Sequence, residues 1–249
     1  MTGASLNLSD CKQSMLSKQI EEIAISKLRG HALKTALHWA DEGLVLRKNV
    51  PDWFSENGNR FFAREDHKLP KISPHPGVPY SKNALVVMGA ASDVGSVMLW
   101  GDNPTVVLSP NAALDGGLLA CGDNSLILCG SHIVCGPSSH LNARNGGAIV
   151  VGDNGLWSAG IRMITDDMHA IRDVHTGKRI NPRGGRVLVG SHVWLGLDAA
   201  LLPGSIVADH CVIGARAVVN GAIEANSVAV GTPARAIRNG ITWTYEDEP

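Results

Sequence analysis

A repeat of six residues governs the hydrophobic pattern in the C-terminal half of the chain. An aliphatic residue stands at every sixth position, at Val189, Leu195, Leu201, Val207, Ile213 and Val219. Four residues after each of the first five comes a second small or apolar side chain, at Val193, Ala199, Ser205, Cys211 and Ala217. Helices have a period of 3.6 residues and strands a period of 2, so neither produces this pattern. The repeat predicts a parallel β-helix whose aliphatic side chains point inward.

Weaker copies of the same repeat extend the predicted coil toward the N-terminus. They begin near Leu85, and we expect loops where the phase is lost, at residues 111–119 and 138–147. The repeat stops again for a long polar excursion at residues 165–187, and such insertions in a regular scaffold often carry function. We therefore predict one β-helical domain over residues 81–235.

Residues 1–80 carry no hexapeptide repeat. Apolar residues spaced along 17–28 predict a short amphipathic helix, and 32–46 reads as a second helix or as a helix followed by a strand. Residues 49–80 are rich in proline, and we expect an extended arm that caps the open end of the coil. The chain then ends in a tail after the coil, over residues 236–249.

Charge and cysteine content narrow the range of functions. The 22 basic and 23 acidic residues nearly balance, which argues against a general nucleic-acid binder. No apolar run is long enough for a transmembrane helix, and the polar N-terminus lacks a signal-peptide core, so we expect a cytoplasmic protein. The cysteines show no paired zinc spacing and are expected to be buried and reduced: Cys11, Cys121, Cys129, Cys135 and Cys211.

The C-terminal repeat resembles the signature of the hexapeptide-repeat acyltransferases. The resemblance rests on Val-Gly-Ser-His-Val-Trp-Leu-Gly at residues 189–196 and on Asn-Ser-Val-Ala-Val-Gly-Thr-Pro-Ala-Arg at residues 226–235. It implies a mainly β protein, a left-handed parallel β-helix with a short helical and irregular N-terminal region. It also implies a homotrimer with active sites between subunits and acetyl-CoA as the acyl donor. The left hand comes from the resemblance alone, since strand crossovers are usually right-handed.

The polar excursion is similar to that of the subgroup that O-acetylates sugars and polysaccharide precursors. In that subgroup the histidine after a short acidic run is the catalytic base, which assigns this role to His169. A neutral imidazole is suited to taking a hydroxyl proton near neutral pH. Asp166 is the expected orienting carboxylate, with Asp167 as the alternative and as a candidate substrate contact. His175 is the second candidate for the base.

The resemblance also assigns binding residues. Coenzyme A is expected along the corners of successive coils, at Leu197, Ala215, Asn220 and Gly221. The family's usual Thr-Lys is replaced by Asn220-Gly221, so Arg235, or Arg216 or Arg238, is expected to supply the phosphate contact. The remaining candidates are Trp194, as a wall for the acceptor or the pantetheine arm, and Asn142, near the acyl group and the acceptor.

These residues predict an acetyl-CoA-dependent O-acetyltransferase that acts on a small-molecule or glycan acceptor. An amine, serine or antibiotic acceptor remains an alternative. A zinc enzyme of the gamma-carbonic-anhydrase type shares the coil, but its His-x-x-x-x-His spacing does not occur here, so we expect no metal. The third alternative is a scaffold without catalytic activity, because a fold does not imply a function.

Overall fold

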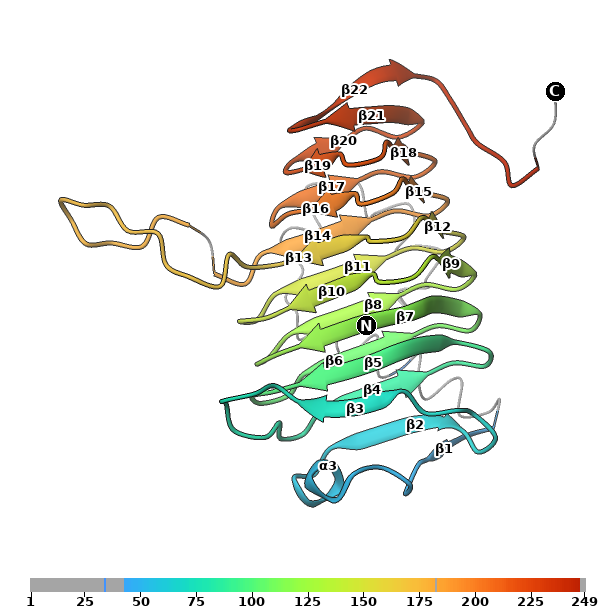
Figure 1. The fold of residues 1–249 in the computed structure, drawn as a ribbon, viewed down its shortest axis with the longest axis vertical. Coiled ribbons are helices and arrows are strands. Elements are labelled where there is room, and N and C mark those ends of the chain that lie inside the picture. The colour runs from blue at the N-terminus through green and yellow to red at the C-terminus, as the bar shows by residue number, and fades with distance from the viewer. Residues whose placement is uncertain (1–33, 35–42, 182, 247–249) are drawn as a thin grey trace, which may run out of the picture.

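The computed structural model describes residues 34, 43–181 and 183–246, and it confirms a parallel β-helix (Figure 1). The helix predicted at residues 17–28, most of the segment 32–46 and Cys11 lie outside the described residues. Leu44–Leu46 forms strand β1 at the end of the segment 32–46, which agrees with one of the two expected alternatives, a strand at this end, and not with a helix throughout. The single helix with a described range is α3 (Asp52–Glu56), just before the coil begins.

The described strands form two sheets that wind around one core. The first sheet contains β1, β2 (Arg60–Arg64), β4 (Leu85–Met88), β6 (Thr105–Leu108), β8 (Leu126–Cys129), β11 (Ala148–Val151), β14 (Arg186–Val189), β17 (Ser205–Val207) and β20 (Ala222–Ile223). The second contains β3 (Lys71–Pro74), β5 (Asp93–Leu99), β7 (Ala112–Cys121), β9 (Ile133–Cys135), β10 (His140–Ala143), β12 (Leu156–Trp157), β13 (Arg162–Ile164), β15 (Trp194–Leu195), β16 (Ala200–Leu201), β18 (Val212–Ile213), β19 (Val218–Val219), β21 (Ser227–Gly231) and β22 (Ala234–Asn239).

The six-residue period sets the register of the coil. Val189 pairs with Val207, Leu195 with Ile213, and Leu201 with Val219, so each residue lies beside the one three hexapeptides further along. All six aliphatic repeat residues are fully buried, and so are Ala199, Ser205, Cys211 and Ala217 between them. Each coil therefore buries an aliphatic layer on the next, and this stacked core holds the corners in place.

Truncation of a core residue should test this stacking. Ile127 of β8 is fully buried between Val106 and Ile149 of the neighbouring coils, so Ile127→Ala removes contacts in three layers. We expect the free energy of unfolding, measured in denaturant, to fall by about 2–5 kcal/mol. Val134→Ala is the control, because Val134 is 55% exposed, and it should change stability by less than about 0.5 kcal/mol. Equal losses in the two variants would contradict the assigned inward face.

Three columns of turns run along the coil. The histidine corner joins β8 to β9, β11 to β12, β14 to β15 and β17 to β18, and it holds His132, His192 and His210 at positive φ. The Leu197 corner joins β9 to β10, β12 to β13, β15 to β16 and β18 to β19. The excursion corner joins β7 to β8, β10 to β11, β13 to β14, β16 to β17 and β19 to β20.

Three segments differ from the sequence-based expectation. The loop expected at residues 111–119 is wrong, because residues 112–119 belong to β7, which continues across a bulge near Gly116. The loop expected at residues 138–147 is wrong in its middle part, where residues 140–143 form β10. The coil also begins before the expected boundary at residue 81. Strands β2 and β3 pair with β4 and β5, and Phe61 and Ala63 of β2 are fully buried in the core. These segments are out of phase with the six-residue repeats on either side of them, so the repeat did not reveal their strands.

The outer face of the first sheet is apolar as well. Leu85, Val87, Val107, Leu128 and Val150 alternate with inward residues, and each is at most 7% exposed. Strands that are buried on both faces read as continuous aliphatic runs, such as Leu-Val-Val-Met in β4. The outer face of the second sheet is more polar on β10 and β13, and it leads to the excursion.

Candidate functional site

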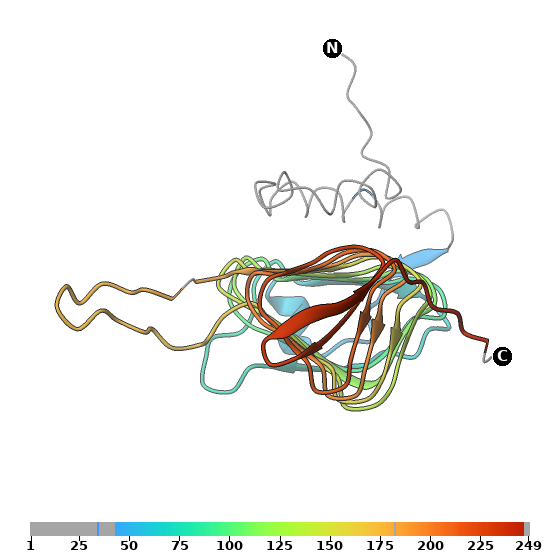
Figure 2. The same ribbon diagram turned by 90° about the horizontal axis from the view of Figure 1, so that it is seen from above.

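The excursion leaves the coil after β13 and returns at β14, so it spans residues 165–185, close to the predicted 165–187 (Figures 1 and 2). It projects away from the coil as two antiparallel segments. The Asp173 amide donates to the Lys178 carbonyl, and the Ile180 amide donates to the Ile171 carbonyl, both at 2.9 Å. The Asn181 side chain accepts from the Ile171 amide and donates to the Asp167 carboxylate.

Asp166 organises the neck of the excursion, which comprises residues 165–167 and 183–185. Its carboxylate accepts hydrogen bonds from the Met168 amide at 2.6 Å, the Gly184 amide at 3.0 Å and the Asn145 side chain at 3.1 Å. The Arg179 guanidinium lies 3.8 Å away. Asp166 thus joins the outgoing segment, the returning segment and the preceding coil, and its side chain is fully buried.

Gly184 is required at the returning end of this neck. Its φ is +68°, and a Cβ atom at this position would clash with the Asn145 carbonyl oxygen. Only glycine allows the returning strand to pass so close to the preceding coil while adopting this φ. The Gly184 amide is thereby placed where it reaches the Asp166 carboxylate.

The pKa of Asp166 is set by opposing influences. Burial by itself raises it, because the charged form loses its hydration. The hydrogen bonds from Asn145, Gly184 and Met168 and the charge of Arg179 act in the other direction and prevail, so the pKa lies below its ordinary value. The carboxylate is therefore ionised at neutral pH and serves as the charged centre of the neck.

His169 is exposed on the outgoing segment just beyond this neck. Its backbone is held at both ends, because its amide donates to the Asp167 carbonyl at 2.8 Å and its carbonyl accepts from Asn181 at 2.9 Å. The described residues provide no hydrogen bond to its imidazole, and both Asp166 oxygens are directed into the neck. The chain therefore presents the ring to solvent and does not bring Asp166 onto it.

Asn142 lies at the base of the excursion on the outer face of β10. It pairs in register with Ile164, the last residue of β13 before the excursion, and it is 5% exposed. Its side-chain oxygen accepts a 3.2 Å hydrogen bond from Nε of Arg144. The Arg144 guanidinium in turn lies over the Trp100 ring, 5.1 Å from its centroid. Asn142 and the neck therefore occupy one region of the coil.

Arg144 and Trp100 were not identified from the sequence. Arg144 stands two residues after Asn142, so an alternating strand places both on one face, and this spacing is the signal that could have found it. Trp100 comes from a different coil, and its contact with Arg144 depends on the stacking of the coils. The third missed residue is Asn181, which bridges the two segments of the excursion.

The residues expected to bind coenzyme A are divided between two corners. Leu197 and Ala215 are exposed on successive coils of the Leu197 corner, where the Arg216 amide donates to the Leu197 carbonyl at 2.7 Å. Arg235 is exposed on β22, opposite Val230 of β21. Asn220 and Gly221 follow β19 at the excursion corner instead. A ligand that touches both sets has to cross the outer face between the two corners.

Trp194 lies on β15, on the side of the coil away from the excursion (Figure 1). Its ring centroid is 6.2 Å from that of Trp243 in the C-terminal tail. Trp243 stacks on His192 with ring centroids 4.1 Å apart and donates Nε1–H to the His192 carbonyl. The chain by itself does not bring Trp194 to His169, so a shared site would need a second subunit.

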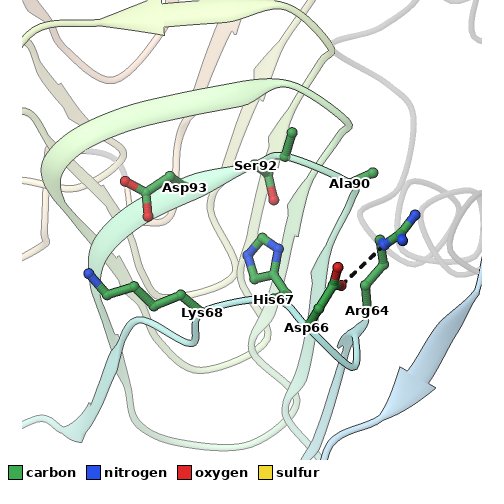
Figure 3. Close-up of a pocket in the computed structure, with 8 residues that line it drawn as sticks. Arg64, Asp66, His67, Lys68, Ala90, Ser92 and Asp93 are labelled. Carbon is green, nitrogen blue, oxygen red and sulfur yellow. Dashed lines mark hydrogen bonds and ion pairs between the residues drawn. The ribbon is translucent and has the colours of Figure 1, made fainter.

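A separate hollow of about 520 Å³ lies at the N-terminal end of the coil (Figure 3). Its lining carries both signs of charge and comprises Arg64, Asp66, His67, Lys68, Ala90, Ala91, Ser92 and Asp93. Burial and the nearby Arg47 lower the pKa of His67, against the opposing effect of Asp93 and Asp66. This hollow contains none of the residues that the sequence selected.

The cysteines of the described region are free and buried, as expected. Burial raises the pKa of Cys135 to about 11, so its thiol is protonated at neutral pH and is a poor nucleophile. Among residues 43–181 and 183–246, no three histidine, cysteine or acidic side chains gather as a metal site. Within the same part of the chain, no helix has the length and apolar character needed to cross a bilayer.

Comparisons with known proteins place this geometry in context. No protein-family model matches the chain. Over 52 residues it is 44% identical to a protein of Escherichia coli K12 assigned as the lipopolysaccharide biosynthesis O-acetyl transferase WbbJ, covering 21% of this chain and 26% of that protein. Over 127 residues it is 26% identical to the polysialic acid O-acetyltransferase of Escherichia coli O1:K1, covering 43% of this chain and 41% of that protein. The chain thus spans less than half the length of either relative.

The solved structure of the polysialic-acid-specific acetyltransferase NeuO superposes with a TM-score of 0.60 at 23% identity, covering 72% of this chain and 85% of that one. The fold is that of the hexapeptide-repeat acetyltransferases. The likeness confirms the left-handed parallel β-helix that the repeat and its resemblance predicted. At 23% identity the likeness shows the fold alone, so the chemistry has to be argued from the residues of this chain.

Proposed function

We propose that this protein is an acetyl-CoA-dependent O-acetyltransferase that acts on a hydroxyl of a sugar or polysaccharide precursor. One observation carries the proposal: a hexapeptide coil with O-acetyltransferases among its sequence relatives is interrupted by a braced excursion that exposes His169. Asp166 fixes the Met168 backbone just before this histidine, and Asn181 holds the histidine's own carbonyl, as a residue that must meet a substrate requires.

His169 is proposed as the general base of a direct transfer. Its imidazole removes the acceptor hydroxyl proton as the oxygen attacks the thioester carbonyl carbon. The new C–O bond forms while the C–S bond breaks, and the proton passes from His169 to the departing thiolate of coenzyme A. Asp166 is a positioning residue in this scheme, because it holds the neck and does not touch the ring.

The Leu197 corner offers a surface that suits an extended acyl donor. Leu197 is 45% exposed, and Ala215 presents only a methyl group one coil further on, so backbone groups are accessible there. Arg235 is exposed on the adjoining strand β22 and could meet a phosphate with its guanidinium. Asn220 and Gly221 bring no charge to the excursion corner, which leaves the phosphate contact to an arginine.

A complete site is proposed to require a second copy of the chain. His169 projects from one side of the coil, while Trp194 and the Leu197 corner lie on other strands and another corner. The excursion also exposes several apolar side chains that isolated loops rarely present to water: Met168, Ile171, Val174 and Ile180. A homotrimer in which each excursion packs on a neighbouring coil would cover them and join His169 to the donor surface.

Calorimetric titration of metal-free protein with acetyl-CoA tests the donor, and thiol release tests the acceptor. The proposal expects saturable binding near one donor per subunit, and thiol release that depends on a sugar hydroxyl. Sedimentation on the same sample should show a trimer. Absence of donor binding would reject the transferase. Thiol release with amine acceptors but with no sugar hydroxyl would indicate that the protein catalyses N-acetylation and not O-acetylation.

A further inference from the structure

The outer face of β10 carries a row of polar side chains that ends at the neck of the excursion. His140 and Asn142 alternate with inward residues, and Arg144 continues the row directly after the strand. The next residue, Asn145, donates to Asp166 and so contacts the neck. The row therefore leads along the outside of the coil to the segment that bears His169.

Arg144 is held at one end and open at the other. Its Nε donates to the Asn142 side-chain oxygen at 3.2 Å, and its guanidinium lies over the Trp100 ring. The Trp100 ring in turn packs against the His75 ring, with the two ring centroids 4.9 Å apart. Its two terminal amino groups form no hydrogen bond or ion pair with the described residues. A guanidinium fixed in this way presents two parallel N–H donors, the geometry that matches a carboxylate.

The surroundings of Arg144 favour an anionic partner. The side chain is partly buried, so its charge has lost some of its hydration without gaining a close carboxylate. Asp166 is the acidic group near it, but the oxygens of Asp166 already serve the neck. Asn142 adds a side-chain amide that donates to none of the described residues, and Nε2 of His140 is buried without a partner. The row thus holds several unused polar groups around one cation.

We propose that Arg144, seated on Trp100 beside Asn142, binds the carboxylate of an acidic sugar and makes acidic glycans the preferred acceptors. This inference rests on the proposed O-acetyltransferase function. The bound carboxylate would anchor the sugar ring at the base of the excursion, so that a nearby hydroxyl can reach His169. Arg144 is a specificity-determining residue here, since the acyl transfer itself needs no group from it.

Binding and turnover with paired acceptors test the assignment. The probes are N-acetylneuraminic acid and galacturonic acid oligosaccharides, each compared with the same oligosaccharide after its carboxyl groups are reduced to alcohols. For Arg144→Gln we expect kcat/KM with a carboxylated acceptor to fall about 10- to 100-fold, mainly through KM. The carboxyl-reduced acceptor should change by less than about threefold. Arg144→Lys, which keeps the charge and loses the paired donors, should fall in between.

Direct titration of the carboxylated oligosaccharides separates this inference from the proposed function. Wild-type protein should bind them, and Arg144→Gln should weaken this binding by the same factor, whether or not any acyl transfer is detected. Arg60→Gln is the control, because Arg60 is exposed on β2 far along the coil, and it should bind normally. Equal losses with both acceptor forms, no binding of the acidic forms by wild-type protein, or a weaker acetyl-CoA affinity in Arg144→Gln would each overturn the assignment.

Discussion

Replacement of His169 by alanine is expected to lower turnover by about 10²- to 10⁴-fold while leaving the affinity for acetyl-CoA unchanged. The variant removes the proposed base, so the acceptor hydroxyl has to lose its proton to water during attack. The fold should not suffer, because the ring is exposed and the bonds to Asp167 and Asn181 use only the backbone of His169. Thiol release under saturating substrates measures the turnover, and calorimetry measures donor binding.

His175→Ala provides the matched control for this measurement. His175 is exposed on the same excursion, and only its backbone amide is bound, by the Asp173 carboxylate. Its replacement should leave turnover within about twofold of wild type. Near-normal turnover in the His169 variant, with loss in the His175 variant, would transfer the role of base to His175.

Replacement of Asp166 by alanine should damage both stability and activity. The change leaves the Met168 amide, the Gly184 amide and the Asn145 side chain without their shared acceptor in a buried place. We expect a loss of about 2–4 kcal/mol in the free energy of unfolding. Turnover should fall because the Met168 backbone just before His169 and the returning segment at Gly184 lose their shared acceptor, even though the imidazole remains.

Asp167→Ala is the control for the neck. Asp167 is exposed, and its carboxylate forms one hydrogen bond, to Asn181, so the cost should stay below about 1 kcal/mol. Denaturant unfolding followed by tryptophan fluorescence gives the stabilities, and thiol release gives the rates. Should the two aspartate variants lose the same stability, the neck described above would not be the structural centre of the excursion.

The low pKa of Asp166 adds a pH dependence with a definite sign. The folded-state value lies below the ordinary 3.8, so the carboxylate stabilises the fold fully above that pH. The stabilisation is lost as the pH falls from about 3.8 through the lower folded-state value. The difference in unfolding free energy between wild type and Asp166→Asn should therefore be constant near neutral pH and shrink in acid. A difference that grows on acidification would contradict the ionised neck.

The sequence by itself determined the coil and the place where it is interrupted. A β-helix repeats its inward positions along the chain, so the aliphatic residues from Val189 to Val219 were sufficient to predict the buried core. The same periodicity located the excursion to within two residues, because a polar segment cannot continue an aliphatic layer. The motifs around it selected His169 and Asp166 through resemblance to related sequences, and the catalytic assignment stays a prediction.

Tertiary structure decided how the site residues are arranged. Asp166 is directed into the neck because Asn145 and Gly184, distant in sequence, bring two donors to its carboxylate, beside the local Met168 amide. Arg144 meets Trp100 only because stacking places different coils against each other. The residues expected to bind coenzyme A are divided between two corners, because the period along the chain does not reveal which side chains meet across coils. The strand β7 replaces an expected loop, because its residues interrupt the period. The inward position of an aliphatic residue recurs at a fixed spacing, so it can be predicted from the sequence. Hydrogen bonds and ring contacts between coils depend on the register of the strands, so they are determined only in the folded chain.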